Sequence, residues 1–285
     1  MSTQPASRKR TLNRGRVRRV EHLSPHMVRL VLGGDGLSAF EAGEYTDHYI
    51  KLLFPQPGVA YPEPFDMDAV RRDMPRAQWP ATRTYTVRFW DPQARELTID
   101  VVYHGDMGLA GPWAAAAQPG DEIYFLGPGG AYAPDPAADW HLLAGDESAL
   151  PAIAASAERL PSGTPAHVVV EVSGPAEEQE IPAPASATVQ WVHRENRRVG
   201  EALVETVRSL ALPEGRGQAF VHGEAGAVKD LRRFLRFERD MSRDQLSASG
   251  YWKLGNDEDG WQAAKTEWNR EVEREEEGLA ASPTH

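Results

Sequence analysis

Residues Arg83 to Arg88 read Arg-Thr-Tyr-Thr-Val-Arg, a run that combines a cation, an aromatic ring and two hydroxyl groups. Such residues favour a β-strand, in which Arg83 and Tyr85 share one face and the two threonines share the other. A guanidinium is a rigid fork of donors that fits a phosphate group, and a tyrosine ring packs against flat ligands. An ordinary half-exposed strand has the same composition, so this run alone leaves both interpretations open.

A glycine-rich turn follows, from His104 to Gly111, and runs into Pro112-Trp113-Ala114. Proline suits the first turn of a helix, and the free N–H groups at a helix N-terminus bind phosphate oxygens. A flavin that carries a pyrophosphate needs both segments, so their combination predicts FAD. A plain turn before a helix, with a structural His104, stays open as the alternative.

The predicted FAD site draws on both segments and on the strand that ends between them. Arg83 is expected to hold the pyrophosphate, Tyr85 to pack on the isoalloxazine ring and Thr86 to hydrogen-bond its edge. The predicted FAD contacts are Arg83, Tyr85, Thr86, Val87, Val102, His104, Ala110, Gly111, Pro112, Trp113 and Ala114.

A second candidate site lies in Leu142 to Ala152, where an apolar strand turns into a helix. Nucleotides bind at such turns in α/β domains, although this turn lacks the Gly-x-Gly-x-x-Gly pattern. We expect a nicotinamide dinucleotide, NADH or NADPH, to contact it at Gly145, Asp146, Glu147 and Ser148. A nucleophilic Ser148 is disfavoured, because that motif needs glycine where Asp146 and Leu150 stand.

The run from His193 to Arg198 contains three arginines and follows the third strand expected in this half of the chain. Arg194 is a candidate contact for the 2′-phosphate that distinguishes NADPH from NADH, and a solvated loop is an equally consistent interpretation. The nine histidines show no metal-ligand spacing, so no metal site is expected.

Composition limits the class of protein. The chain has 285 residues, with 31 Lys and Arg against 42 Asp and Glu, which argues against a nucleic-acid-binding surface. Cysteine is absent, which excludes disulfides, thiolate catalysis and cysteine-ligated metal centres. No apolar run has the length of a membrane span, and the first residues are polar and basic without an apolar h-region, so we expect a cytoplasmic protein without integral membrane contact.

Two charged runs lie near the ends of the sequence. The basic one is expected to be a solvated arm that leads into the first strand; it contains Arg8, Lys9, Arg10, Arg14, Arg16, Arg18 and Arg19. The acidic one, Glu271 to Glu277, is expected to be an exposed helix face or a frayed tail.

The first half of the sequence predicts a small antiparallel barrel that binds FAD. Short runs rich in β-branched and aromatic residues alternate with Gly and Pro clusters, and one helix, 110–117, interrupts them. A polar insert from Pro55 to Pro80 is expected to leave the barrel and to be partly disordered. The expected strands are 16–20, 26–32, 45–54, 83–90, 96–102 and 122–126.

Beyond Gly127-Pro128-Gly129-Gly130 and Pro134-Asp135-Pro136 the pattern changes to strands that alternate with helices. Such alternation predicts a parallel sheet with helices on both faces. The expected architecture is therefore a six-stranded FAD-binding barrel over 1–137, followed by a doubly wound NAD(P)H-binding α/β domain over 138–285 with a helical tail.

The chain resembles the siderophore-interacting proteins, the flavin-dependent ferric-siderophore reductases of the ferredoxin–NADP reductase superfamily. The resemblance covers nearly the whole chain and rests on several segments besides the Arg83 strand and the Gly111 helix start. They are Asp47-His48-Tyr49-Ile50-Lys51-Leu52, Ala144-Gly145-Asp146-Glu147-Ser148-Ala149-Leu150-Pro151 and Ser249-Gly250-Tyr251-Trp252-Lys253-Leu254-Gly255.

This resemblance implies FAD in the barrel, a nicotinamide dinucleotide as electron source, and a basic pocket for an anionic ferric siderophore. Lys51 and Lys253 fall on two of the basic positions of that pocket, and solvated lysines at strand ends are the alternative. The sequence departs from the family at Gly129, where an arginine is common. It also departs at Gly111, where a serine or threonine is common, so main-chain N–H groups are expected to carry more of the phosphate contact.

Two other functions stay open at this point. A general flavin or quinone reductase could be built on the same fold, and it would lack discrimination among ferric chelates. A non-catalytic siderophore-binding protein would lack bound flavin.

Overall fold

The computed structural model describes residues 11–281, and the chain divides into two compact units. The first unit ends at Ala131 and the second begins at Tyr132. Each unit has its own hydrophobic core. Across residues 11–281, no helix combines the length and the apolar character needed to cross a bilayer.

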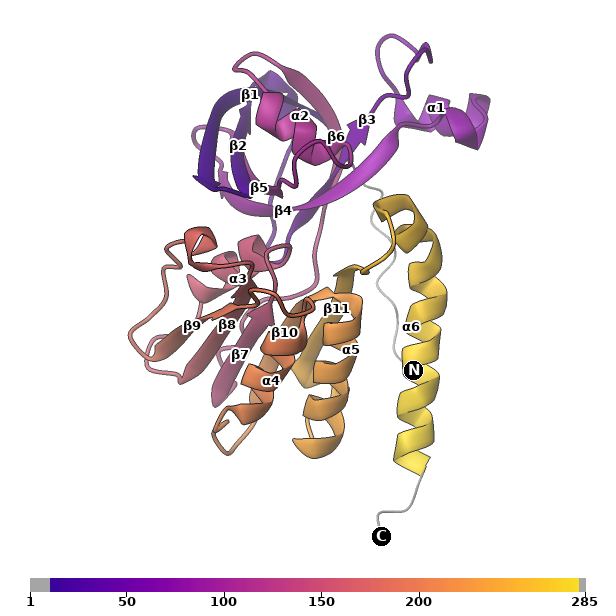
Figure 1. Ribbon diagram of the computed structural model, residues 1–285. Helices are drawn as coiled ribbons and strands as arrows, with labels where there is room; N and C mark the ends of the chain where they lie inside the picture. The colour runs from indigo at the N-terminus through magenta and orange to yellow at the C-terminus, as the bar shows by residue number, and fades with distance from the viewer. Residues whose placement is uncertain (1–10, 282–285) are drawn as a thin grey trace. The chain divides into compact units, whose positions relative to one another are not determined.

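The first unit is built from six strands: β1 (Thr11–Ser24), β2 (Met27–Gly33), β3 (Tyr49–Phe54), β4 (Ala81–Asp91), β5 (Glu96–Val102) and β6 (Glu122–Gly129). They close into an antiparallel barrel in the order β1-β2-β5-β4-β3-β6 (Figure 1). Inward-facing Leu30, Ile50, Leu52, Ile99 and Phe125 are fully buried in its core, as the alternation of a strand requires. The predicted six-stranded antiparallel barrel is confirmed.

The basic run leads into the first strand, as expected, but this strand begins earlier than predicted. Arg14, Arg16, Arg18 and Arg19 belong to β1 and are exposed, and Arg16 and Arg19 pair with Glu122 and Glu96 at 2.7 and 3.0 Å. The predicted residues Arg8, Lys9 and Arg10 lie outside the described part of the chain.

The insert between β3 and β4 is folded rather than partly disordered. It contains α1 (Met67–Asp73), and the Asp66 carboxylate caps that helix by accepting from two main-chain N–H groups. Met67 and Val70 of α1 are buried against Leu53 and Leu126. This second apolar cluster fixes the insert, a contact that the mostly polar sequence of the insert conceals.

The second unit contains five parallel strands: β7 (Trp140–Gly145), β8 (Ala166–Val172), β9 (Ala187–His193), β10 (Gly217–Glu224) and β11 (Leu246–Trp252). Their order is β11-β10-β7-β8-β9, so all five carboxyl ends lie at one edge of the sheet. The helices of this unit are α3 (Leu150–Ala157), α4 (Glu201–Ser209), α5 (Ala225–Arg233) and α6 (Glu258–Ala281).

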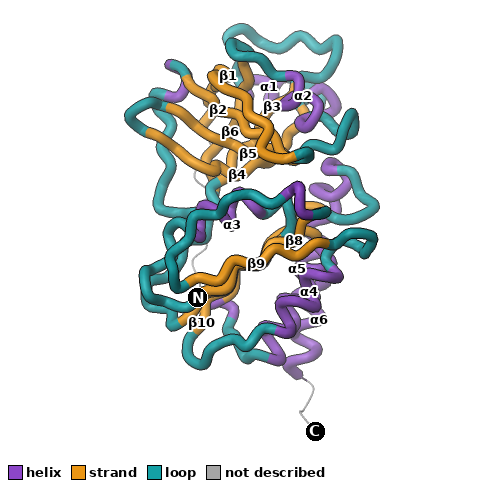
Figure 2. Tube along the Cα trace, turned by 60° about the vertical axis from the view of Figure 1, so that its left-hand side comes forward, coloured by secondary structure: helices purple, strands orange, loops and turns teal. Residues whose placement is uncertain are grey.

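Helices cover both faces of this sheet, as predicted. Leu142 and Ala144 of β7 pack in one cluster with side chains of α4 and α5, which lie side by side (Figure 1, Figure 2). Gly145 directly follows Ala144 in β7, so it points to the opposite face of the sheet, where it lies close to Ile153 of α3. Helix α3 therefore covers this second face. The connections between strands thus cover both faces, which makes the sheet doubly wound.

Helix α6 is anchored along the second unit instead of forming a solvated tail. Trp261 is only 1 % exposed and its ring meets Trp268 edge-on at 5.4 Å. Near the other end, Glu276 is buried and forms a bidentate ion pair with Arg232 of α5. The expectation of an exposed or frayed acidic segment is therefore wrong for Glu276, because a buried carboxylate needs such a partner.

Candidate functional site

The strand β4 presents its predicted ligand residues on two faces. Arg83 and Tyr85 stand opposite the buried Leu52 and Ile50 of β3, whereas Thr84 stands opposite Lys51. Residues directly opposite in an antiparallel pair share a face, so Arg83 and Tyr85 lie together, as the sequence predicts. The half-buried Tyr85 ring packs against the barrel core, and a guanidinium nitrogen of Arg83 donates to the Thr82 carbonyl at 2.9 Å.

The next two residues of β4 are buried more deeply. Thr86 is 6 % and Val87 is 5 % exposed, and the Val87 side chain belongs to the barrel core. The Val87 N–H donates to the His48 carbonyl at 2.6 Å, just before the register of β4 against β5 shifts. The Val87 N–H is therefore occupied by the protein, and Thr86 carries its hydroxyl next to a strand irregularity.

The predicted phosphate-binding turn connects β5, which ends at Val102, to α2 (Ala110–Ala116). Gly105 and Gly108 adopt φ angles of 62° and 79°, and nothing lies within 4 Å of the position that a side-chain Cβ would take on either. These left-handed conformations favour glycine, and the open space leaves the backbone of the turn accessible. A glycine-rich turn of this kind lets a ligand approach the main chain closely.

The first turn of α2 combines free main-chain donors with small buried residues. Ala110 and Ala114 are buried, and a Cβ on Gly111 would lie 3.2 Å from the Val102 carbonyl oxygen, so a larger residue there would press on β5. Pro112 lacks an N–H, and Trp113 packs edge-on against Phe54 at 5.8 Å. The donors that this turn offers are therefore main-chain N–H groups of its first residues.

His104 lies at the start of the turn and is exposed. Its ring is 6.1 Å from the ring of His26, which lies between β1 and β2. The structure thus leaves His104 accessible to a ligand and also gives it a neighbouring ring, so its predicted cofactor contact stays a prediction.

These features fit FAD. A pyrophosphate needs donors, which the Arg83 guanidinium and the first turn of α2 supply, and a close approach, which Gly105 and Gly108 allow. A flat ring system needs a flat partner, which the half-buried Tyr85 supplies.

In the second unit the predicted nucleotide turn is held by buried contacts. A Cβ on Gly145 would lie 2.3 Å from the His222 carbonyl oxygen of β10, so only glycine fits at this point. The next residue, Asp146, is 2 % exposed and accepts four hydrogen bonds. Burial raises the pKa of Asp146 to about 6, because desolvation outweighs the hydrogen bond that Ser148 donates to the carboxylate.

The four donors to Asp146 come from three segments of the second unit. The main-chain N–H and the hydroxyl of Ser148 donate to Oδ1 at 2.9 and 2.5 Å. The Glu224 N–H and the Trp252 indole N–H donate to Oδ2 at 2.7 and 2.8 Å. Asp146 therefore ties its own turn to the carboxyl ends of β10 and β11.

Arg194 is held by carboxylates. Its guanidinium forms a bidentate pair with Glu147, at 2.9 and 2.6 Å, and lies 3.6 Å from a carboxylate oxygen of the fully buried Glu171. These carboxylates raise the pKa of Arg194 even though burial opposes its charge. A 2′-phosphate would have to compete with two negative groups for this arginine.

Sequence reasoning missed three residues of this edge, Glu171, Glu224 and Trp252. Glu171 accepts from the Gly200 and Leu203 N–H groups at the start of α4, both at 2.9 Å. Glu224 accepts from the Gly226 and Ala227 N–H groups at the start of α5, at 2.7 and 3.0 Å. A signal was present, since a lone carboxylate in the apolar run from Val168 to Val172 must find buried donors.

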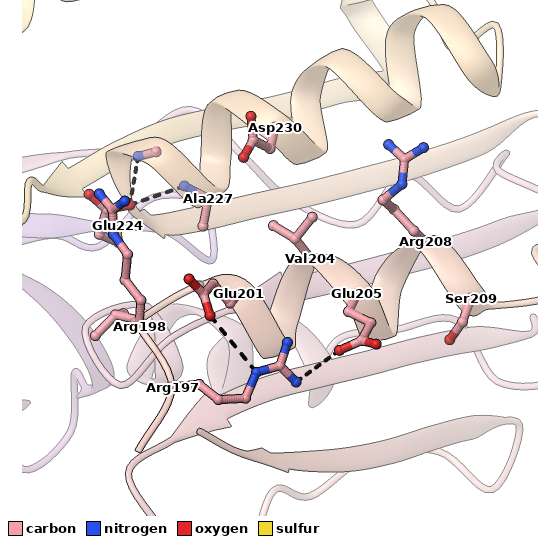
Figure 3. A pocket seen from close by; sticks show the side chains of 13 residues that line it. Arg197, Arg198, Glu201, Val204, Glu205, Arg208, Ser209, Glu224, Ala227 and Asp230 are labelled. Atoms are coloured by element: carbon pink, nitrogen blue, oxygen red, sulfur yellow. Dashed lines mark hydrogen bonds and ion pairs between the residues drawn. The ribbon is translucent and has the colours of Figure 1, made fainter. Parts of the chain in front are cut away.

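An open groove of about 830 Å³ runs between α4 and α5 and reaches the loop before α4 (Figure 3). Arg197 lines it and pairs with Glu205 at 2.8 Å, and the exposed Arg198 extends toward Glu224. Acidic and basic side chains both line this groove, so its surface is neither uniformly positive nor uniformly negative in charge.

The two lysines of the predicted substrate pocket lie in different units. Lys51 of β3 is half-buried beside Thr84, with 3.4 Å between the ammonium group and the hydroxyl. Lys253 directly follows β11, and its carbonyl accepts from the Asn256 N–H at 3.0 Å. At Gly129, a Cβ would lie 2.5 Å from Cζ of Tyr49, so the Tyr49 ring covers the position where an arginine is common in the resembling family.

Comparison with known proteins finds a family match in each half of the chain. A family described as siderophore-interacting FAD-binding domain matches residues 16–132, and one described as siderophore-interacting protein matches residues 138–255. Among the residues that the structure describes, no group of three or more His, Asp or Glu could hold a metal ion.

Individual relatives cover most of the chain. The uncharacterized protein Rv2895c of Mycobacterium tuberculosis is 46 % identical, over 90 % of this chain and 94 % of its own length. The ferric vibriobactin reductase ViuB of Vibrio cholerae is 34 % identical, over 85 % of this chain and 90 % of its own length. The crystal structure of SipS from Aeromonas hydrophila matches with a TM-score of 0.77 and 31 % identity, over 92 % of this chain and 99 % of SipS.

Proposed function

The chain belongs to the siderophore-interacting protein family of FAD-binding oxidoreductases, and we propose that it reduces ferric siderophores with electrons from NADH or NADPH. The observation that carries the proposal is the joint presence of the Arg83–Tyr85 face of β4 and the open glycine turn before α2. They occur in the barrel that matches a siderophore-interacting FAD-binding domain.

In this proposal the protein supplies binding and electrostatics. FAD, when bound, supplies the conversion of one hydride into two single electrons, so one NAD(P)H reduces two ferric chelates. The Arg83 guanidinium and the first turn of α2 hold the pyrophosphate, and Tyr85 covers the isoalloxazine ring. Iron is released because hard anionic oxygen ligands bind Fe(III) far more tightly than Fe(II).

The second unit is proposed to receive the nicotinamide dinucleotide at its carboxyl edge. The Gly145–Ser148 turn is rigid, since Gly145 fits tightly against β10 and Asp146 ties the turn to its neighbours. Glu171 and Glu224 already cap α4 and α5. The dinucleotide is therefore proposed to lie over the turn before α3 rather than against those two capped helix starts.

Lys51 and Lys253 are proposed to attract the anionic ferric chelate. A lysine near a solvated site acts as a point charge worth roughly 1 kcal/mol, and its effect is screened by salt. We expect Lys51→Ala and Lys253→Ala each to raise the KM for a ferric siderophore about fivefold at low salt. FAD content and flavin reduction by NAD(P)H should stay close to those of the wild type.

The proposal is tested by anaerobic absorption spectroscopy of the purified protein. NAD(P)H should bleach the flavin band, and a ferric siderophore should restore it while a ferrous indicator records Fe(II). Lys229→Ala is the matched control, because Lys229 is a lysine of α5 that pairs with Glu275.

Two results would overturn this function. Protein without flavin would favour a siderophore-binding protein. A bleached flavin that is reoxidised equally well by quinones and ferric chelates, with unchanged KM in both lysine variants, would favour a general flavin reductase.

A further inference from the structure

The two residues that flank Lys253 are both held by buried carboxylates. On the side before Lys253, the Trp252 indole N–H donates to Oδ2 of Asp146 at 2.8 Å. On the side after it, the Leu254 N–H donates to Oε1 of Glu224 at 3.2 Å. Asp146 and Glu224 are 2 % and 5 % exposed, so both bonds are shielded from competing water.

The contact with Trp252 reaches across the sheet. Trp252 ends β11, whereas Asp146 follows β7, and β10 lies between these two strands. The Asp146 carboxylate can lie against β10 because Gly223 has no side chain: a Cβ there would lie 2.7 Å from that carboxylate. The register of β10 against β11 also shifts after Gly223, which pairs Glu224 with Trp252.

One carboxylate therefore holds two functional segments. Oδ1 of Asp146 binds Ser148 of the turn proposed to receive the nicotinamide dinucleotide, and Oδ2 binds Trp252, the neighbour of the lysine proposed to bind the ferric chelate. The four hydrogen bonds that Asp146 accepts occupy both of its carboxylate oxygens, and the residue is 2 % exposed, so its carboxylate serves as a structural acceptor.

We propose that Asp146 and Trp252 form a positioning junction that fixes Lys253 relative to the Gly145–Ser148 turn. This inference rests on the proposed function for the role of Lys253, and on the hydrogen bonds above for the hold on its two neighbours. Trp252 then acts on the ferric chelate only through Lys253.

Hydrogen–deuterium exchange of the full FAD-loaded chain tests the hold directly. In Trp252→Phe, which removes one indole N–H and keeps an aromatic ring, amide exchange in residues 250–256 should rise about tenfold. Asp146→Asn should raise exchange in 250–256 and also in 145–150. Trp268→Phe removes an indole N–H on α6 and is the matched control, with unchanged exchange in both segments.

Steady-state kinetics test the route through Lys253. Trp252→Phe should raise the KM for a ferric siderophore about threefold to tenfold, while the rate of flavin reduction by NAD(P)H stays within twofold. The double variant Trp252→Phe/Lys253→Ala should be no worse than Lys253→Ala alone, because a residue that acts through another adds nothing once the other is gone.

Unchanged exchange of 250–256 in Trp252→Phe would overturn the junction, and additive effects in the double variant would overturn the route through Lys253. If Asp146→Asn does not fold, the Trp252→Phe arm decides alone. Wild-type protein that binds FAD but reduces no ferric chelate would overturn the proposed function and the substrate role of Lys253, while the exchange experiment would still report the hold on residues 250–256.

Discussion

At the scale of single residues, three buried carboxylates organise the carboxyl edge of the sheet. Asp146, Glu171 and Glu224 each accept main-chain N–H groups, and two of them cap helices. Acidic residues beside a nucleotide turn invite a catalytic interpretation, yet these oxygens are occupied by the protein itself. Their role is to satisfy donors that a buried loop would otherwise leave unpaired.

Asp146 makes stability depend on pH in a stated direction. Burial raises its pKa from 3.8 to about 6, so the folded state favours the protonated carboxyl more than the unfolded chain does. This contribution is full below about pH 4 and is lost as the pH rises through about 6. We expect the free energy of unfolding of the wild type, relative to Asp146→Asn, to fall by about 2 kcal/mol between pH 4 and pH 7.

Urea unfolding of both proteins across this range measures that difference. His222 titrates in the opposite direction, because burial lowers its pKa to about 3, but it is present in both proteins and cancels. A difference that stays flat between pH 4 and pH 7 would contradict the assignment to Asp146.

Arg83 gives a prediction for cofactor retention. If its guanidinium holds the pyrophosphate, Arg83→Ala should lose about 2 kcal/mol of FAD affinity, which is about thirtyfold. Flavin content after dialysis measures the loss. Arg72→Ala, which removes an exposed arginine of α1, should retain FAD, and normal retention in Arg83→Ala would count against the contact.

At the scale of elements, both proposed binding turns depend on glycine for different reasons. Gly105 and Gly108 supply left-handed conformations in an open turn, so they expose the backbone. Gly145 instead allows two strands and a helix to approach, because a Cβ there would overlap the His222 carbonyl oxygen. The first turn is thereby suited to ligand approach and the second to rigidity.

Gly145→Ala should therefore destabilise the second unit by roughly 1–3 kcal/mol, since the added methyl group forces β7 and β10 apart. Denaturant unfolding followed by far-UV circular dichroism measures the change. Gly174→Ala is the matched control, because Gly174 has extended backbone and nothing lies within 4 Å of its added methyl group. Equal stability of the two variants would refute the close approach at Gly145.

At the scale of the whole molecule, the chain carries two separate cores and an acidic surface. The barrel core and the α/β core share no residue. Helix α6 adds its own anchor to the second unit through Trp261 and through the pair of Glu276 with Arg232.

Trp261→Ala should destabilise the second unit by about 3–5 kcal/mol, because it empties a site that is 1 % exposed. Thermal unfolding should show a lower Tm for the transition that FAD does not shift. FAD content of the folded protein should be unchanged, and Trp268→Phe should behave like the wild type. A Trp261→Ala protein with an unchanged Tm would show that α6 contributes nothing to this core.

The sequence by itself determined the architecture and predicted the ligand-binding segments, because both depend on local patterns. In the first half, short strand-like runs that alternate with Gly and Pro clusters predicted the barrel. In the second half, strands that alternate with helices predicted the parallel sheet. The Arg83 strand with its glycine turn predicted a flavin site. These signals are carried by residues close together along the chain. The periodic spacing of side chains along strands and helices was sufficient to interpret them.

The tertiary structure decided which polar side chains are already occupied. The pairing of Arg194 with Glu147, the burial of Glu276 against Arg232, and the reach of Trp252 to Asp146 all join residues far apart in sequence. No local pattern records them, since a charged residue in a loop has the same appearance whether it faces water or a buried partner. Desolvation and hydrogen bonding in the folded state make that choice.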